Sequence, residues 1–308
     1  MEKLKRKGTI TVAIIGGIIV IALMVFGTIW VGQAAKKDAT EAVQSVSLLY
    51  LEELADRREQ VVENNLQDYV DIIEVAVGLM NDEDKSDVAH LMEYQAKMRA
   101  LFNLERFAFV DEKGIIHTAD GTENTIDEYD FDYEKMTGPE ISVKNIDKKD
   151  KKVVIAEPIK GVTVDGHKMI ACFMQIDMKE MLHGLSMDSD EDDATFCNIY
   201  TSDGIALSNT ILGGLAVEDN LLDALENADF EGDDSAEKVR NDFEEGKARD
   251  VSFEYNGIQE TLSYVPIKGT DWELTYLVRD SVVSEILSPV TTGIIRRSLL
   301  QTILSALI

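Results

Sequence analysis

The apolar positions along the chain fall into three patterns, and each pattern predicts a different kind of element. An uninterrupted apolar run fills residues 10–31, and no charged residue lies between Thr9 and Ala35. A run of this length predicts a helix that crosses a bilayer. Residues 33–77 contain no Gly or Pro, and their apolar side chains recur at helical spacing, which predicts one long stalk helix. Further along, short alternating segments separated by turns predict β-strands.

Two of these alternating regions share the same order of landmarks. The tetrapeptide Pro-Ile-Lys-Gly occurs at 158–161 and again at 266–269. Each copy follows an apolar strand, a turn closed by Gly114 or Gly204, and a second strand, an order that indicates a hairpin. A period near 100 residues is too long for a solenoid and is typical of a duplicated small α+β domain. We expect each tetrapeptide to begin or precede a central strand of its sheet.

The flanking charges predict how the first helix is oriented. Four basic residues, Lys3, Lys5, Arg6 and Lys7, precede the apolar run, and this predicts a cytoplasmic N-terminus. A cleaved signal peptide is the alternative, but the apolar core is longer than such peptides usually have. The last eleven residues, SLLQTILSALI, are too short to span a bilayer, so we expect them to begin a second transmembrane helix, with an amphipathic tail on the membrane surface as the alternative.

Composition narrows the choice of partners. The net charge of −28 excludes the basic surface that nucleic-acid binding requires. Cys172 and Cys197 lie in apolar strands without a CxxC spacing, so we interpret them as buried thiols, and they could pair only if their strands approach closely.

No motif for catalysis, metal binding or a cofactor is visible. The four histidines do not form HExxH or another metal spacing, and no GxSxG, Walker or GxGxxG loop occurs. The acidic stretch at 188–193 lacks the Gly and Glu positions of an EF-hand and is interpreted as a solvated linker. The sequence therefore predicts no catalytic residue, no metal and no cofactor.

The order of elements resembles a known family, the double Cache (dCache) sensor regions. The segment Tyr264-Val-Pro-Ile-Lys-Gly-Thr-Asp-Trp272 is similar to that family's membrane-proximal strand signature, and Gln175-Ile-Asp177 is similar to the end of the last distal strand. The resemblance covers roughly residues 33 to 290. It implies two tandem PAS-like modules, of which the membrane-distal one binds a small ligand.

The resemblance also implies where a ligand would bind. The amino-acid-binding subgroup of the family uses an Arg-x-Trp-Tyr motif in the distal module, which this chain lacks, and only Asp177 matches that subgroup. The ligand class therefore stays open. The residues that we expect to line the distal pocket are Arg99, Arg106, Tyr129, Tyr133 and Asp177. Arg99 in a surface ion pair and Asp177 as a helix cap are the structural alternatives.

The predicted fold class is α+β, with an N-terminal transmembrane helix, a stalk helix, two tandem PAS-like antiparallel sheets and the start of a second transmembrane helix. The expected boundaries are a cytoplasmic N-terminus (1–9), a transmembrane helix (10–32), the stalk and a second helix (33–104), the distal module (105–187), the proximal module (188–287) and an exit segment with the second span (288–308).

The predicted function is the extracytoplasmic ligand-sensing region of a membrane-bound signalling receptor. We expect it to bind a small molecule and to form a homodimer through the stalk helix. The missing cytoplasmic output domain would be a histidine kinase or a diguanylate cyclase. A chemoreceptor sensor, a membrane-anchored enzyme and a scaffold are the alternatives.

Overall fold

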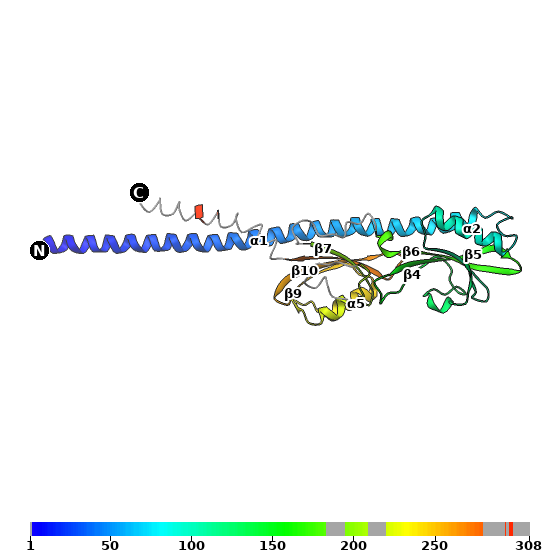
Figure 1. Cartoon of the computed structure of the whole chain (residues 1–308). Coiled ribbons are helices and arrows are strands. Elements are labelled where there is room, and N and C mark those ends of the chain that lie inside the picture. Colours follow the sequence, from blue (N-terminus) through cyan, green and yellow to red (C-terminus); the bar gives the residue numbers. More distant parts are fainter. Residues whose placement is uncertain (1, 183–194, 209–219, 280–292, 294–295, 298–308) are drawn as a thin grey trace. The chain divides into compact units, whose positions relative to one another are not determined.

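The computed structural model describes residues 2–182, 195–208, 220–279, 293 and 296–297 (Figure 1). The chain forms two compact units, residues 51–278 and residues 1–50 with 279–308. Helix α1 (Glu2–Gly78) is continuous, as the absence of Gly and Pro in the stalk predicted. The predicted acidic linker and nearly all of the second predicted span lie outside the described residues.

No helix in the part of the chain that the structure describes is long and apolar enough for a membrane span. The two predicted spans stay predictions from the sequence.

The first module is a six-stranded antiparallel sheet with the strand order β3-β2-β1-β6-β5-β4. Its strands are β1 (Arg106–Asp111), β2 (Ile116–Thr118), β3 (Gly121–Glu123), β4 (Glu140–Lys144), β5 (Lys152–Val164) and β6 (His167–Asp177). The helical elements beside it are α2 (Val88–Leu101), the 3-10 turn η1 (Ile126–Glu128) and α3 (Met178–Met181). Helix α2 starts where Asp87 accepts a hydrogen bond from the His90 backbone N–H, as an N-cap does.

The second module is a five-stranded antiparallel sheet with the strand order β7-β11-β10-β9-β8. Its strands are β7 (Thr195–Thr201), β8 (Asp229–Phe230), β9 (Arg249–Tyr255), β10 (Ile258–Ile267) and β11 (Trp272–Arg279). Two short helices, α4 (Leu221–Leu225) and α5 (Ala236–Glu245), pack on one face of this sheet. The core between them includes Phe196, Leu221, Phe243, Phe253, Tyr264 and Leu277.

Helix α1 contacts both modules within the unit of residues 51–278. The Asn65 side chain donates a hydrogen bond to the Met181 carbonyl oxygen (3.2 Å) in the first module. In the second module, the Lys268 ammonium lies 3.4 Å from the Glu63 carboxylate. The same helix therefore supports both sheets.

The two modules repeat one turn in detail. In the first module, the Asp111 backbone N–H donates to the Ile115 carbonyl, and the Gly114 N–H donates to the Asp111 carbonyl. Thr201, Gly204 and Ile205 make the same two bonds in the second module. Gly114 and Gly204 both adopt positive φ (76° and 86°), which explains why each turn needs Gly. The predicted duplication of this turn is confirmed.

The strand orders align β5 with β10, and β5 contains the whole first tetrapeptide while β10 ends with Pro266 and Ile267 of the second. As expected, each copy precedes a central strand, β6 in the first module and β11 in the second. Pro158–Gly161 lies within β5 at a register shift, and Pro266–Gly269 ends β10 and starts the turn to β11. Gly161 and Gly269 both have positive φ (79° and 80°). The shared Gly therefore makes a bulge in one module and a turn in the other.

Candidate functional site

One face of the first sheet carries an aromatic cluster. Side chains alternate between the two faces of a strand. Ala108 on β1, Val154 on β5 and Phe173 on β6 lie on the same face of the sheet. The rings of Tyr129 and Phe131 cover this face, with centroids 4.7 and 5.3 Å from the Phe173 ring. This packing fixes the position of Tyr129 above the sheet.

The same face becomes polar at one end of these strands. Arg106 pairs with Gln175 across β1 and β6, and Lys152 pairs with Asp177 across β5 and β6. Strand alternation places all four side chains on the face of the aromatic cluster. Arg106 and Asp177 are diagonal neighbours on adjacent strands, so their Cα atoms lie roughly 7–8 Å apart.

Charges of both signs surround Tyr129 at this polar end. The Lys144 ammonium lies 3.9 Å from the centre of the Tyr129 ring and 2.9 Å from the Glu128 carboxylate. The Arg106 guanidinium lies 2.8 Å from the Glu123 carboxylate. These contacts hold two cations beside one aromatic ring, an arrangement suited to binding an anionic group.

Lys152 is the buried centre of the second group of charges. Its ammonium donates to the carboxylates of Asp177 (2.9 Å), Asp150 (2.7 Å) and Glu105. The other oxygen of Asp177 accepts the Lys179 backbone N–H (2.8 Å) and caps α3. Burial would raise the pKa of Asp177, but Lys152 and the Lys179 N–H hold this pKa below its usual value.

The structure brings together three of the five residues predicted to line the pocket, because Arg106, Tyr129 and Asp177 share one face of the sheet. Tyr133 packs against the aromatic cluster, but its hydroxyl lies beside Gly114, beyond the opposite end of β1. Arg99 lies on α2, where its guanidinium pairs with the exposed Asp120 carboxylate at 3.0 Å. That contact is the surface ion pair that the sequence left open as an alternative.

Sequence reasoning missed Lys144, Lys152 and Gln175. Gln175 and Lys152 were recoverable in principle, because strand alternation places them on the face that also carries Phe173 and Val154. The pairing of Lys152 with Asp177 was not recoverable, since it depends on the register between β5 and β6.

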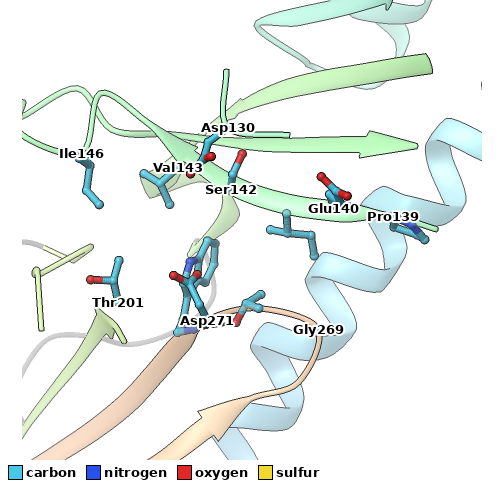
Figure 2. A pocket seen from close by; sticks show the side chains of 12 residues that line it. Asp130, Pro139, Glu140, Ser142, Val143, Ile146, Thr201, Gly269 and Asp271 are labelled. Carbon is cyan, nitrogen blue, oxygen red and sulfur yellow. Dashed lines mark hydrogen bonds between the residues drawn. The ribbon is translucent and has the colours of Figure 1, made fainter. Parts of the chain in front are cut away.

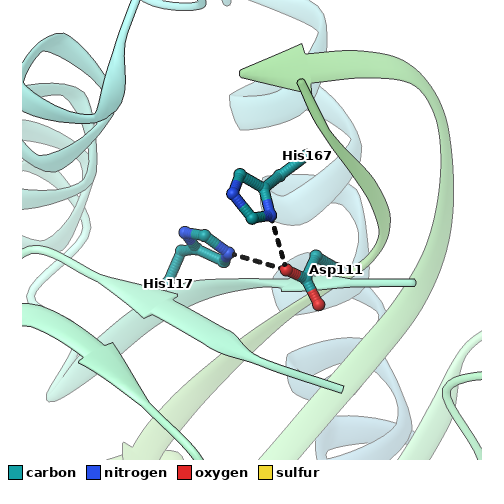
Figure 3. A group of neighbouring side chains, drawn as sticks. All are labelled: Asp111, His117 and His167. Atoms are coloured by element: carbon teal, nitrogen blue, oxygen red, sulfur yellow. Dashed lines mark hydrogen bonds and ion pairs between the residues drawn. The ribbon is translucent and has the colours of Figure 1, made fainter. Parts of the chain in front are cut away.

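A second polar group lies elsewhere in the first module. Asp111, His117 and His167 offer one carboxylate oxygen and two ring nitrogens that lie within 4.8 Å of one another (Figure 3). No other trio of this kind was found in the described part of the chain. These residue types in this arrangement could hold a metal ion.

A cleft of about 450 Å³ lies between β4 and the β10–β11 turn (Figure 2). Asp130, Glu140 and Ser142 line one side, and Thr201 and Asp271 line the other. Burial raises the pKa of Asp271, with smaller contributions from neighbouring acids that include Asp130. Among its described lining residues there is no Lys, Arg or His to balance these acids.

Both cysteines are buried free thiols, as interpreted from the sequence. Burial raises the pKa of the Cys172 thiol, and it also raises the pKa of the Cys197 thiol. Neither is therefore a reactive thiolate.

Neither a protein-family model nor a curated protein sequence matches the chain. Solved structures with a similar fold do exist. The ligand-binding domain of the Campylobacter jejuni chemoreceptor Tlp3, in complex with L-norvaline, is 9% identical, and the similarity covers 79% of this chain and 94% of that chain with a TM-score of 0.53. The ligand-binding domain of Mlp24 with asparagine is 13% identical, with coverage of 81% and 98% and a TM-score of 0.52.

A third similar structure is the extracellular domain of mmHK1S-Z3, assigned as a histidine kinase. It is 12% identical, with coverage of 80% of this chain and 98% of that chain and a TM-score of 0.53. The fold of the chain is therefore that of the ligand-binding sensor domains of chemoreceptors and histidine kinases, consistent with the double Cache sensor region that the sequence predicted.

Proposed function

We propose that the chain is the extracytoplasmic ligand-sensing region of a membrane-bound signalling receptor. The observation that carries this proposal is the polar end of the first sheet, where Arg106, Lys144 and Asp177 gather on the aromatic face of a sensor-domain fold. The first module is the membrane-distal, ligand-binding module, and the second connects it to the output. The output domain is a histidine kinase or a diguanylate cyclase, with a chemoreceptor output as the alternative.

The charges predict the class of ligand. Arg106 and Lys144 would bind a carboxylate or another anionic group, while Asp177 and Glu123 would accept hydrogen bonds from an amine or hydroxyl. Tyr129 would contact the apolar part of the molecule. The cations and acids now pair with one another, so a ligand carrying both charges would exchange these pairs for its own. A small zwitterionic or hydroxylated molecule therefore fits best.

The surface of α1 supports the membrane anchor. Between Ile15 and Val31 this helix exposes large apolar side chains, among them Leu23 (65% exposed), Phe26 (71%) and Trp30 (67%). Such a contiguous apolar surface needs a lipid or protein partner. The proposed anchor lies in the membrane, and the two sheets lie outside the cytoplasm because basic residues precede the apolar run.

Transmission of the signal requires a ligand that binds two conformations unequally. Helix α1 contacts the first module at Asn65 and the second at Glu63, so a small displacement of either sheet acts on one rigid element. A homodimer through α1 would let two such helices move against each other by about 1–2 Å, which is the usual scale for helix shifts.

The first prediction concerns Asp177. We expect at least one small molecule, from a panel of L-amino acids, amines, carboxylates and hydroxylated metabolites, to raise the unfolding temperature of the purified full chain. Asp177→Asn should weaken its binding at least about tenfold, because it removes the charge that faces the ligand amine or hydroxyl. Asn is as good an N-cap as Asp, so α3 should persist. Calorimetric titration gives the affinities.

Asp229→Asn is the matched control, because Asp229 is an exposed acid on β8 of the second module. It should leave the affinity unchanged. Equal affinity of the Asp177→Asn variant and the original chain for an identified ligand would remove Asp177 from the site. Binding that is lost only on changing residues of the second module would move the ligand site there.

A further inference from the structure

We propose that Asp111, His117 and His167 form a binding site for a divalent first-row transition cation, with Zn²⁺ as the reference ion. The site lies on the first sheet's other face, away from the aromatic cluster, because His117 and Asp111 alternate with Ile116 and Val110 of that cluster. It is therefore separate from the proposed ligand site and does not depend on it.

The three donor atoms converge on one point. The His117 Nε2 and the His167 Nδ1 each lie 3.2 Å from the same oxygen, Asp111 Oδ2 (Figure 3). Ligand atoms about 2.0–2.2 Å from a tetrahedral Zn²⁺ lie roughly 3.3–3.6 Å from one another. Two edges of the required tetrahedron are thus nearly present before any ion binds.

The third edge, between the two histidine nitrogens, can form by a movement of His167, the most exposed of the three residues. The donor atoms all lie within 4.8 Å of one another, and the His167 side chain is 42% exposed, while those of Asp111 and His117 are 0% and 5% exposed. Rotation of His167 can therefore close the third edge without disturbing the core. Its exposure also gives the ion a route of entry and leaves a fourth coordination position on the solvent side.

The turn itself does not require Asp111 to be acidic. Asp111 Oδ1 accepts the backbone N–H groups of Lys113 (2.9 Å) and Ile115 (3.0 Å). In the equivalent turn of the second module, the Thr201 hydroxyl accepts the Ile205 N–H at 3.0 Å. A neutral side chain thus suffices for this turn. The buried second oxygen of Asp111 therefore serves only the two imidazoles, and a bound cation could be shared by all three groups.

The two histidines are also particular to the first module. The buried Leu207 occupies in the second module the place that His117 has in the first, two residues after the shared Ile of the turn. His167 starts β6 after the Asp165-Gly166 turn, on the extension that follows the bulge at Gly161. The second module turns at Gly269 instead and has no such extension. All three residues that would bind the cation therefore lie where the first module differs from the second.

Two buried polar atoms support a metal-bound imidazole. His117 Nδ1 and Gln95 Oε1 have no hydrogen-bond partner among the described residues. The Gln95 amide already donates to the His117 backbone carbonyl through Nε2 (2.5 Å), which places the Gln95 side chain beside this residue. A metal-bound His usually donates its second ring N–H to an oxygen. Binding of a cation at Nε2 fixes the proton on Nδ1, and a small movement of the Gln95 amide would let Oε1 accept it.

The donor set selects the cation. Two imidazoles and one carboxylate suit Zn²⁺, Cu²⁺ or Ni²⁺, whereas Ca²⁺ and Mg²⁺ prefer sites made of oxygen atoms. We therefore expect Ca²⁺ and Mg²⁺ not to compete.

The experiment uses the full chain, free of any histidine tag and stripped of metal with a chelator. Titration with Co²⁺, followed by its visible absorption, should show one equivalent bound in a low-coordinate site, and Zn²⁺ should displace it. Three variants take their design from the chain: Asp111→Thr and His117→Leu copy the second module, and His167→Gln changes an exposed side chain. Each should weaken Co²⁺ binding at least about tenfold. His90→Gln is the control, because His90 pairs with Asp87 outside the cluster.

The proposal is overturned if the original chain binds neither Co²⁺ nor Zn²⁺ at micromolar concentration. It is equally overturned if all three variants bind as tightly as the His90→Gln control, since the ion would then lie elsewhere. Circular dichroism of each variant checks its fold. His167→Gln keeps the test decisive should the two buried substitutions unfold the chain. Because the probe is the metal alone, the result is independent of any organic ligand.

Discussion

Trp272→Ala is expected to lower the free energy of unfolding of the chain by about 3–5 kcal/mol. Trp272 starts β11, is 1% exposed and is among the largest fully buried side chains of the described residues. It pairs with Thr201 across β11 and β7, which places it beside the turn that both modules share. Truncation would leave a large cavity there. Urea unfolding followed by circular dichroism measures the change.

Trp272→Phe provides the comparison, since it keeps an aromatic ring in place. The indole N–H of Trp272 has no hydrogen-bond partner among the described residues, so replacing Trp272 with Phe removes no hydrogen bond. The Phe variant should therefore be destabilised much less than the Ala variant. A loss below about 1 kcal/mol for Trp272→Ala would show that this side chain is not part of the core.

The fold was predictable where local pattern and backbone geometry agree. The turns at Gly114 and Gly204 were predicted because positive φ restricts the choice of residue. The continuous helix α1 followed from the absence of Gly and Pro between residues 33 and 77. The first tetrapeptide lies inside β5 and the second ends β10, and this difference was not predictable, because the same residue types make a bulge at Gly161 and a turn at Gly269.

The two polar sites were harder to predict because they depend on register. The pairing of Lys152 with Asp177 spans 25 positions, and that of Asp111 with His167 spans 56. No local motif relates such residues, so the histidines were interpreted only as lacking a metal spacing. Comparing the two modules position by position would have flagged them, since Asp111 and His117 replace Thr201 and Leu207.

Glu273→Gln is expected to stabilise the chain at alkaline pH. Glu273 lies on β11 and is 2% exposed. Its Oε2 atom has no hydrogen-bond partner among the described residues. Burial, with a smaller contribution from the Asp242 carboxylate, raises the pKa of Glu273 to about 8. The charge of Asp242 is compensated by the Arg249 guanidinium (3.2 Å) and by the Tyr264 hydroxyl (2.8 Å).

The sign of the effect follows from proton linkage. Between the usual Glu pKa of 4.5 and a pKa of about 8, the folded chain holds a proton on Glu273 that the unfolded chain has lost. The free energy of unfolding therefore falls as pH rises through this window, by up to about 1.4 kcal/mol per pH unit. Gln copies the neutral acid and removes this dependence. At pH 9 the variant should be more stable than the original chain by up to about 5 kcal/mol.

Urea unfolding at a series of pH values from 4 to 9 tests this expectation. Near pH 4 both folded chains have a neutral group at position 273, so their stabilities should agree within about 1 kcal/mol. Glu244→Gln, which changes an exposed acid on α5, should follow the original chain at every pH. A constant difference between Glu273→Gln and the original chain across the series would show that Glu273 does not titrate in this window. It would also show that the carboxyl has a compensating partner in the folded state, because a buried carboxylate without one has a raised pKa and keeps its proton to a higher pH.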